Sequence, residues 1–293
     1  MFLRIVTFFL ILGSSSGRAQ TRADKINITS ITGTPSVSVK KQELKLTSIK
    51  LDQKSPQLYR FFIQGGLHGN ETLTTEFVHW LESRIINGQS PLNSLPPGSV
   101  IDLLANANPD SHGRYRYNAN NVNLNRNFSV LWGLSKEPMG TKAFSEPETR
   151  AVKKLFEKRR YLAAVDIHGY LNWVVLPTKL KESDRYRTWV EAVSKHARVL
   201  PGYLTKVAGD LGDGGAFEDW AFWEQGSLAV CLEMRYPARF FNFEKRINLD
   251  SFLSYESFIH RLFLESLEII PSKDEIALNG HFQQDYLSLP LSH

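Results

Sequence analysis

The sequence predicts an α/β domain built around a largely parallel sheet, and three observations support this fold class. Segments with strand character alternate with segments of helical periodicity along most of the 293 residues, as in layered α/β proteins. The run Leu162 to Ile167 is almost continuously apolar, which is typical of a strand buried on both faces. Polar residues, among them Gly65 to His68, Asn108 to Asp110 and His168, come at the predicted strand ends, where open α/β sheets bind ligands.

The first nineteen residues have the pattern of a secretory signal peptide. Arg4 precedes the apolar run Ile5 to Leu12, and Gly17-Arg18-Ala19 supplies small residues for cleavage. The apolar run is too short to cross a bilayer, so a cleaved leader is favoured over an uncleaved membrane anchor. No other stretch approaches transmembrane length. We therefore expect a secreted or periplasmic protein with no membrane span in the mature chain.

Charge and cysteine content exclude some function classes. Removal of residues 1–19 would leave 33 basic residues against 30 acidic ones, spread along the chain. This is typical of a solvated surface, whereas nucleic-acid binding needs a concentrated basic patch, so no nucleic-acid partner is expected. The single cysteine, Cys231, excludes an internal disulfide. Because it lies in the apolar run Ser227 to Met234, it is interpreted as a buried strand thiol rather than a nucleophile.

The N-terminal half is assigned from hydrophobic pattern and stop signals. Residues 20–43 are polar and form a short N-terminal segment that enters the first strands. The elements predicted next are, in order, strands over Leu44–Leu51 and Tyr59–Gln64, a helix over Thr74–Ile86, and a strand over Val100–Ala105. The segment 111–145 is long, irregular and rich in Asn, Arg and aromatic residues; a loop of that length inside a domain is usually functional.

In the C-terminal half, Ser145-Glu146-Pro147-Glu148 predicts a helix start, because proline suits the first helical position and acids suit the first turn. The elements from there on are, in order, a helix to about Lys158, strands over Leu162–Ile167 and Trp173–Leu176, a helix over about Asp184–His196, a Gly/Asp-rich loop over 209–215, a strand over Leu228–Met234 and a long helix over Leu249–Ile270. These elements are interpreted as one domain over residues 44–270, and residues 271–293 form a C-terminal tail or an extra edge element.

Three of these residues have the chemistry of a catalytic zinc site. His68 and Glu71 stand three residues apart where a strand turns into a helix, and His168 ends a later strand. Two imidazoles and one carboxylate leave the fourth tetrahedral position of zinc open for water. Taken alone, His-x-x-Glu is a weak signal, and the second histidine strengthens it.

A longer series of motifs resembles the zinc carboxypeptidase family, the M14-like metallocarboxypeptidases. Gly-Gly-x-His-Gly-x-Glu, Asn-Pro-Asp, Asn-Arg-Asn-Phe, Ser-Glu-Pro-Glu-Thr, Asp-Ile-His and a late Leu-Glu occur here in the family's order, over roughly residues 44–270. The motifs are most similar to the bacterial branch that includes murein tripeptide amidases. The resemblance implies a three-layer α/β/α sandwich with a mixed, largely parallel sheet, and hydrolysis of a C-terminal peptide or isopeptide bond.

By position, the resemblance makes His68, Glu71 and His168 the ligands of one Zn²⁺ per chain. Glu233 would be the general base toward zinc-bound water, and its apolar strand should raise its proton affinity. An alternative for Glu233 is a buried salt bridge with Arg235, since strand alternation puts both on one face.

The resemblance also assigns substrate contacts in the irregular segment. Arg116 would stabilise the oxyanion of the tetrahedral intermediate, with Arg114 as a rival for that role. Asn125 and Arg126 would clamp the substrate's terminal carboxylate. Glu218 falls where relatives select the substrate side chain, and an acid there favours a cationic group such as lysine or diaminopimelate.

Other side chains near these motifs have weaker assignments. His112 could line the pocket. Asp166 could brace His168 or serve a structural hydrogen bond.

Two positions depart from the family's pattern. The family usually has an aspartate two residues before the clamp asparagine, where it accepts a hydrogen bond from the first zinc histidine; here the residue is Asn123. Loss of that negative charge predicts weaker zinc binding than an aspartate would give, and Asn123→Asp should tighten it. The mobile tyrosine of digestive carboxypeptidases is replaced by Leu211, which favours the bacterial amidases.

The sequence thus predicts a secreted or periplasmic zinc metallocarboxypeptidase acting on small peptides with a free carboxylate, including peptidoglycan-derived fragments and γ-glutamyl amides. Two alternatives stay open. One is a zinc-dependent N-acyl amino acid deacylase, which shares the ligands and the base. The other is a non-catalytic peptide-binding relative, which the Asn123 departure keeps open.

Overall fold

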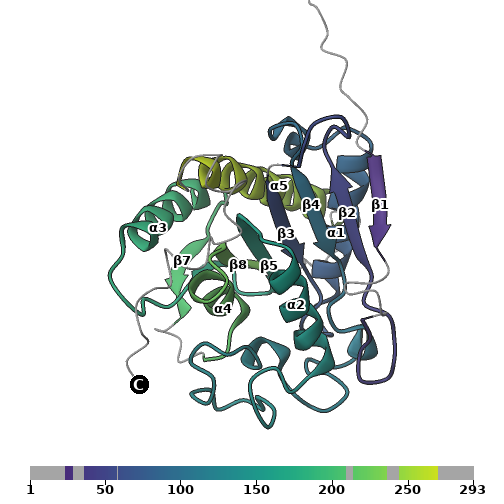
Figure 1. Cartoon of the computed structure of the whole chain (residues 1–293), viewed down its shortest axis with the longest axis vertical. Helices are drawn as coiled ribbons and strands as arrows, with labels where there is room; N and C mark the ends of the chain where they lie inside the picture. Colours follow the sequence, from purple (N-terminus) through teal and green to yellow (C-terminus); the bar gives the residue numbers. More distant parts are fainter. Residues whose placement is uncertain (1–23, 29–35, 58, 209–213, 236–243, 270–293) are drawn as a thin grey trace, which may run out of the picture.

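The computed structural model describes residues 24–28, 36–57, 59–208, 214–235 and 244–269, and in them an eight-stranded mixed sheet is covered by helices on both faces (Figure 1). The strands are β1 (Asp24–Ile28), β2 (Leu46–Lys50), β3 (Arg60–Gln64), β4 (Val100–Leu104), β5 (Ala163–Gly169), β6 (Trp173–Leu176), β7 (Leu204–Val207) and β8 (Leu228–Met234). The α-helices are α1 (Thr72–Ile86), α2 (Pro147–Lys158), α3 (Asp184–Ala197), α4 (Phe217–Trp223) and α5 (Glu244–Ile269). Short 3₁₀ helices are η1 (Pro91–Ser94), η2 (Pro109–Ser111) and η3 (Leu124–Arg126).

The sheet has the strand order β1-β2-β4-β3-β5-β8-β6-β7. Its centre, β4, β3, β5 and β8, is parallel, while β2 and β1 continue antiparallel at one edge. At the other edge β6 is antiparallel to β8 and parallel to β7. The parallel centre explains the apolar run of β5, because all its side chains from Ala163 to His168 are buried. The predicted α/β fold with a mixed sheet is confirmed.

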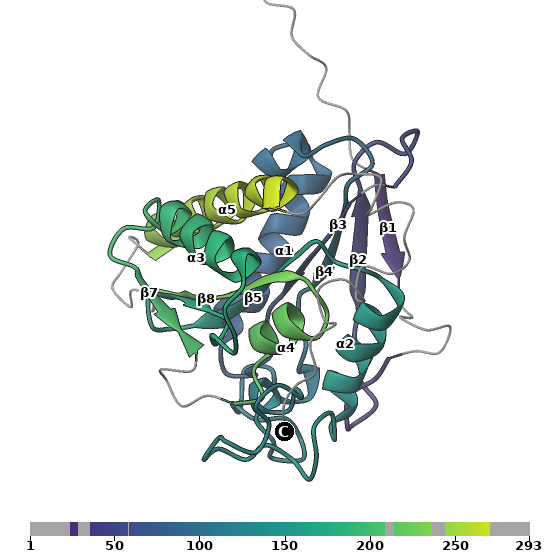
Figure 2. The same cartoon turned by 60° about the vertical axis from the view of Figure 1, so that its left-hand side comes forward.

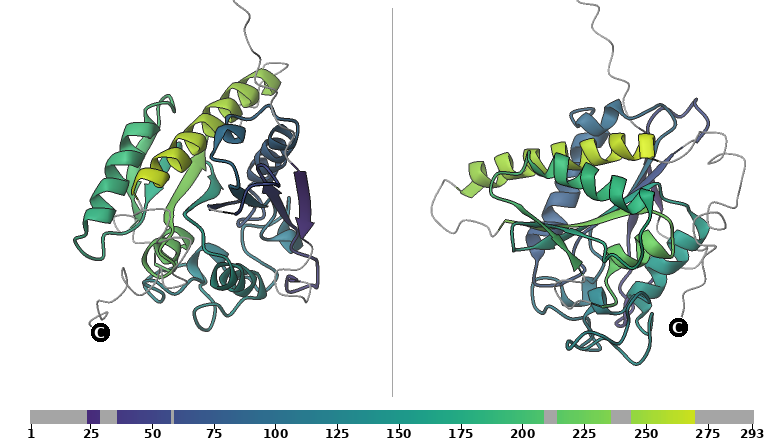
Figure 3. Two further views of the ribbon diagram at one scale, coloured as in Figure 1. Left: turned by 45° about the horizontal axis from the view of Figure 1, so that its top comes forward. Right: turned by 90° about the vertical axis from the view of Figure 1, so that its left-hand side faces the viewer.

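Two adjacent phenylalanines of β3 show how the layers are built. Phe61 stacks on Phe263 of α5 with ring centroids 4.4 Å apart, whereas Phe62 contacts Phe156 of α2 at 5.2 Å and Phe217 of α4 at 6.0 Å. Because successive strand side chains point to opposite faces, the core is divided into two halves. Helices α1, α3 and α5 cover one half and α2 and α4 the other (Figures 2 and 3).

The predicted elements agree with the observed ones to within two residues at each end, except that α5 begins at Glu244 rather than Leu249. Three of the observed strands and α-helices, and the short 3₁₀ helices, were not predicted. The N-terminal segment contributes β1, which pairs with β2. Helix α4 is buried at all seven residues, so it has no polar face to reveal a helical period. Strand β7 has four residues and none of them is buried, as expected of an edge strand.

Some predictions concern residues that the structure does not describe. The leader (1–19), Leu211 and the tail (271–293) lie outside the described residues. Among the described helices, none has the length and apolar character needed to cross a membrane.

The carboxyl ends of the central strands meet the irregular segment between β4 and α2, which lies along the lower edge of the molecule in Figure 1. The backbone N–H of Gly65, just after β3, donates to Leu104 at the end of β4. The N–H of Gly69 donates to Arg116 within the irregular segment. These bonds bring the predicted motifs to one end of the sheet.

Candidate metal centre and substrate site

A glycine-rich turn between β3 and α1 presents the first two candidate ligands. Gly66 has a φ of +68°, and a Cβ on Gly69 would lie 2.5 Å from the carbonyl oxygen of Ser111. Both positions therefore need glycine, the first for its backbone conformation and the second for close approach. The turn closes with the N–H of Glu71 donating to the carbonyl of His68 at 3.1 Å.

The side chains of His68, Glu71 and His168 converge on one point. Their ligand atoms lie within 4.8 Å of one another and all three residues are buried. Nδ1 of His68 is 2.9 Å from Glu71 Oε1 and 3.0 Å from His168 Nδ1, and His168 Nδ1 is 3.3 Å from Glu71 Oε2. The neighbouring pair His68 and Glu71 and the distant His168 thus form a group that could bind a metal. Two neutral imidazoles and one carboxylate fit Zn²⁺, which takes such nitrogen and oxygen ligands.

The other nitrogen of each imidazole is held by an oxygen acceptor. His68 Nε2 lies 3.0 Å from Asn123 Oδ1, and His168 Nε2 lies 2.8 Å from Asp166 Oδ2. When Nε2–H donates in each pair, Nδ1 keeps its lone pair and points to the common centre. The expected contact of Asn123 with His68 is confirmed, as is the bracing contact of Asp166 with His168.

The charges of the three groups depend on one another. Burial works to raise the pKa of Glu71, but the adjacent His68 and His168 outweigh it and lower that pKa. Burial lowers the pKa of His68. For His168 burial acts in the same sense, but the Asp166 carboxylate outweighs it and raises the pKa well above the ordinary value. Glu71 is therefore an anionic ligand, and a cation would compete with a proton for His168.

Glu233 on β8 lies beside this group. It is the register partner of His168 on β5, and its Oε2 is buried with no hydrogen-bond partner in the described part of the chain. Burial raises the pKa of Glu233 to about 7, and the Glu71 carboxylate adds to the rise. The predicted increase in proton affinity is confirmed.

The alternative salt bridge between Glu233 and Arg235 is not seen among the described residues. The Arg235 guanidinium donates to the carbonyl of Pro201 at 2.6 Å. Arg235 lies beyond the end of β8 at Met234, so strand alternation no longer fixes its direction.

The two candidate arginines of the irregular segment differ in position. Arg116 donates from a guanidinium NH1 atom to Glu71 Oε1 at 3.0 Å, whereas Arg114 is exposed. His112 is exposed as well. The structure thus brings Arg116 to the ligand group and leaves Arg114 and His112 at the surface.

Asn125 and Arg126 lie on η3 and are buried. The N–H of Phe217 donates to Asn125 Oδ1 at 2.8 Å, so this amide can serve a carboxylate through its Nδ2 donor. Arg126 donates from Nη1 to the backbone carbonyl of Asn125 at 2.6 Å, which fixes the guanidinium against η3.

Glu137 is a site residue that sequence reasoning missed. Its Oε2 accepts from Asn123 Nδ2 at 2.6 Å and lies 3.5 Å from Arg116 Nε, while its Oε1 lies 3.7 Å from an NH2 atom of Arg126. These positively charged neighbours and Asn123 outweigh partial burial and lower the pKa of Glu137. Glu137 belongs to no motif and lies in irregular structure, so the sequence carries no signal for it.

Glu218 on α4 is buried behind the ligand group. Its Oε2 has no hydrogen-bond partner in the described part of the chain. Burial, followed by the Asp219 and Asp166 carboxylates, raises the pKa of Glu218 to about 8. Burial, and then Glu218 and Glu233, raises the pKa of the Cys231 thiol well above its ordinary value. This confirms Cys231 as a buried, protonated thiol.

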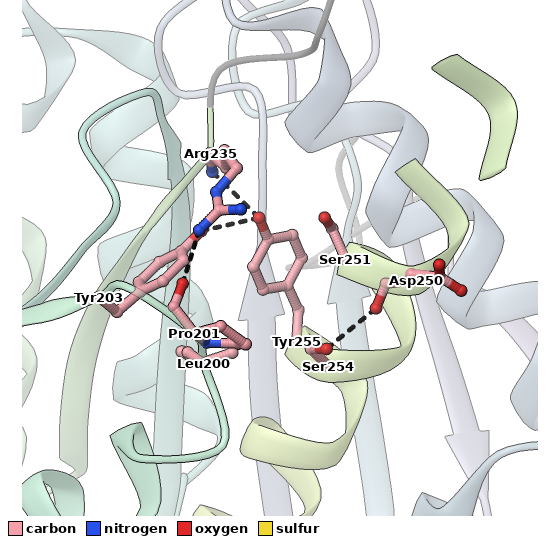
Figure 4. A pocket seen from close by; sticks show the side chains of 8 residues that line it. All are labelled: Leu200, Pro201, Tyr203, Arg235, Asp250, Ser251, Ser254 and Tyr255. Carbon is pink, nitrogen blue, oxygen red and sulfur yellow. Dashed lines mark hydrogen bonds between the residues drawn. The ribbon is translucent and has the colours of Figure 1, made fainter. Parts of the chain in front are cut away.

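A separate pocket of about 210 Å³ is lined by none of the candidate ligand, base or substrate residues. It is formed by the segment after α3, Arg235 and the first half of α5 (Figure 4). Its polar groups satisfy one another: Tyr203 donates to the hydroxyl of Tyr255 at 2.7 Å, and that hydroxyl accepts from the N–H of Arg235 at 3.0 Å.

The fold and the ligand group define a class of protein. A two-histidine, one-carboxylate centre at the carboxyl ends of a parallel sheet, with an adjacent carboxyl group of pKa about 7, is typical of metal-dependent hydrolases. The chain belongs to the zinc carboxypeptidase family, because the model of that family matches residues 22–257. The description of that family is zinc carboxypeptidase.

Known proteins show the same likeness. The chain is 29% identical over 109 residues to carboxypeptidase SOL1 of Arabidopsis thaliana, and the match covers 36% of this chain and 22% of that relative. It thus spans about a fifth of that relative's length. Carboxypeptidase A from Helicoverpa armigera shares the fold with a TM-score of 0.63 at 19% identity, covering 83% of this chain and 68% of that one.

Murein-tripeptide amidase from Escherichia coli O157 aligns at 20% identity with a TM-score of 0.49, covering 77% and 89% of the two chains. This score does not decide the branch, which stays a prediction.

Proposed function

We propose that the protein is a zinc metallocarboxypeptidase that hydrolyses a C-terminal peptide or γ-glutamyl amide bond in small peptides, including peptidoglycan-derived ones. One observation carries the proposal. The Nδ1 atoms of His68 and His168 and the Glu71 carboxylate converge beside Glu233, a carboxyl group with a pKa of about 7. Three ligands and a base of matched proton affinity are what metal-assisted hydrolysis requires.

His68, Glu71 and His168 would hold the ion, and Asn123 and Asp166 would fix the imidazoles from behind. When bound, zinc supplies a Lewis acid that polarises a carbonyl and makes water more acidic. The net charge of such a centre stays positive because Glu71 is its one anionic ligand.

Glu233 would exchange the protons of the reaction. With a pKa of about 7 it can accept a proton from water near neutral pH and then donate it to the leaving nitrogen. Its burial beside His168 keeps other proton donors away from Oε2.

Arg116, Asn125 and Arg126 would bind the substrate. Arg116 reaches the ligand group through Glu71 and is therefore placed to stabilise charge on the carbonyl oxygen. The Asn125 amide and the Arg126 guanidinium, both held on η3, would bind the terminal carboxylate.

Glu218 would select the side chain of the terminal residue. A buried carboxyl group with a pKa of about 8 is neutral at neutral pH, and a cationic partner would ionise it. The site therefore favours a terminal lysine or diaminopimelate, which pairs with the ionised group.

The location of the protein is part of the proposal. The leader pattern of residues 1–19 favours export, with cleavage after Ala19. N-terminal sequencing of the protein purified from its native source tests this: a mature start at Gln20 is expected, and an intact Met1 would exclude cleavage.

A peptide panel tests the activity. Wild type, Glu233→Gln and the matched control Glu157→Gln, on the exposed side of α2, are loaded with zinc. Each is incubated with cell-wall tripeptides and tetrapeptides, ordinary peptides ending in lysine or phenylalanine, and N-acyl amino acids. Zinc-dependent release of the C-terminal residue by wild type and the control is expected. Cleavage of N-acyl amino acids alone, or of nothing, would overturn the proposal.

A further inference from the structure

We infer that Glu137 is a positioning residue: acting through Asn123, it fixes the ring nitrogen that His68 offers to the metal. The inference rests on the ligand assignment in the proposed function. It adds a residue that neither the motifs nor the ligand group contain, and it changes the expected role of Asn123.

A directed chain of hydrogen bonds carries the inference. Glu137 is an ionised carboxylate, because its neighbours lower its pKa, and a carboxylate can only accept hydrogen bonds. Asn123 must therefore turn its Nδ2 group to Glu137, at 2.6 Å, and its Oδ1 to His68 Nε2, at 3.0 Å. An oxygen facing Nε2 selects the Nε2–H form of the imidazole and leaves Nδ1 as the ligand atom.

A second contact holds the same amide orientation. The backbone N–H of Asn125 donates to Asn123 Oδ1 at 3.0 Å. Asn123 is fully buried, so a flipped amide would face this N–H and the Nε2–H of His68 with its own donors. The flipped state is therefore unfavourable from both sides while Glu137 is present.

Glu137 also returns the negative charge that Asn123 lacks. In the family pattern an aspartate contacts the first zinc histidine directly. Here the amide carries the contact, and the carboxylate stands one hydrogen bond further away. The charge still raises the basicity of His68, through a polarised amide rather than by contact.

The contact distances of Glu137 favour a positioning role over an alternative role, in which its carboxylate would occupy the site of the substrate carboxylate. A carboxylate near Arg116 and Arg126 could occupy the substrate's place. However, its contacts with these arginines are 3.5 and 3.7 Å, longer than good hydrogen bonds, while its bond to Asn123 is 2.6 Å. The shortest contact of Glu137 is therefore with the Asn123 amide and not with either guanidinium group.

The chain of bonds changes what Asn123→Asp should do. With Glu137 in place, the new carboxylate would lie next to an existing one and lose the 2.6 Å hydrogen bond. Like charges at that separation repel, so the single variant should not bind zinc more tightly. Removing the charge of Glu137 at the same time should make the aspartate favourable.

A double-mutant cycle on zinc affinity tests this, by competition with a chromophoric chelator at pH 8. Glu137→Gln should weaken zinc binding about 10-fold, the lower end of the range for residues behind metal ligands. Asn123→Asp should leave the affinity equal or weaker. The double variant should return to within about 3-fold of wild type, because the introduced aspartate then contacts His68 directly. The control Glu157→Gln, an exposed acid paired with Lys153, should bind as wild type does.

A second readout needs neither zinc nor activity. ¹⁵N NMR of the metal-free protein at pH 8 reports which imidazole nitrogen carries hydrogen and how fast that hydrogen exchanges with solvent. In wild type the Nε2–H of His68 should exchange slowly with solvent, because Asn123 Oδ1 accepts from it. In Glu137→Gln the same hydrogen should exchange faster. Unchanged zinc affinity and unchanged Nε2–H exchange in Glu137→Gln, or tighter zinc binding by Asn123→Asp alone, would overturn the inference. Neither measurement depends on peptide cleavage, so a failure of the proposed activity is distinguished from a failure of this inference.

Discussion

Two kinds of buried carboxyl group in this domain differ in how they are neutralised. Asp102, in the middle of β4, is fully buried, and its oxygens accept from Arg60 and Arg159 at 2.8 Å each, from Tyr161 at 2.6 Å and from Ser48. Both oxygens accept hydrogen bonds, Oδ2 from three donors and Oδ1 from Ser48, and the two arginines balance the charge. Such a network holds β2, β3, β4 and the end of α2 together.

Glu218 and Glu233 have the opposite character. Each has a buried Oε2 without a partner in the described structure, and burial raises their pKa values to about 8 and about 7. An unpartnered buried oxygen costs about 1–3 kcal/mol. The comparison teaches that the carboxyl group that ties strands together has several donors here, while those beside the candidate ligands have an oxygen without a donor among the described residues, as is common at functional sites.

Removing the proton acceptor should have the largest effect. In zinc-loaded Glu233→Gln we expect kcat to fall by about 10²–10⁴-fold, the usual contribution of a general base. The free energy of unfolding should not fall, because the replaced carboxyl group makes no hydrogen bond through Oε2. Steady-state kinetics and urea unfolding of the same preparation measure both. A loss of stability with kcat retained would place Glu233 in the same class as Asp102.

The reverse result is expected for Asp102→Asn. Loss of the charge leaves the Arg60 and Arg159 guanidinium groups without their buried counter-ion. Breaking a buried ion pair from one side costs about 3–5 kcal/mol, so the free energy of unfolding should drop by about 3 kcal/mol. Urea unfolding measures the drop. The kcat per folded, zinc-loaded molecule should stay within about 2-fold of wild type, and a larger fall would connect this network to catalysis.

The sequence could predict the fold and the grouping of the candidate ligands for a physical reason. His68, Glu71 and His168 stand at or just past strand ends, where the α/β topology itself brings side chains together, so their local pattern was sufficient to place them in one group. Glu137 and the network of Asp102 depend on how irregular or distant segments pack, and no periodicity records that. Helix α4 was missed because all its residues are buried, although Glu218 within it was identified by its place beside Asp219-Trp220.

An effect of intermediate size is expected in the dependence of kcat/KM on pH. Glu233 must be deprotonated to accept a proton, and its pKa is about 7. The value of kcat/KM should therefore fall about tenfold per pH unit below this pKa and level off above it. This acidic limb of the pH profile should lie at the same pH in wild type and Glu137→Gln, since Glu137 acts on His68. If the residual activity of Glu233→Gln shows the same acidic limb, the limb belongs to a group other than Glu233.

The smallest effect concerns Glu218 and the stability of the metal-free protein. The folded-state pKa of about 8 lies above the ordinary value of 4.5, so between these pH values the native state holds a proton that the unfolded state has lost. The contribution of this group to stability is therefore present below about pH 4.5, declines as pH rises toward 8 and is then fully lost. In Glu218→Gln this decline should disappear, leaving the variant about 1–2 kcal/mol more stable than wild type at pH 8.5.

The same variant should lose its preference for peptides ending in lysine over those ending in alanine. Urea unfolding across pH 5–9 and paired kcat/KM values measure the two effects. If the variant is less stable at pH 8.5, Glu218 is held by donors after all and belongs with Asp102.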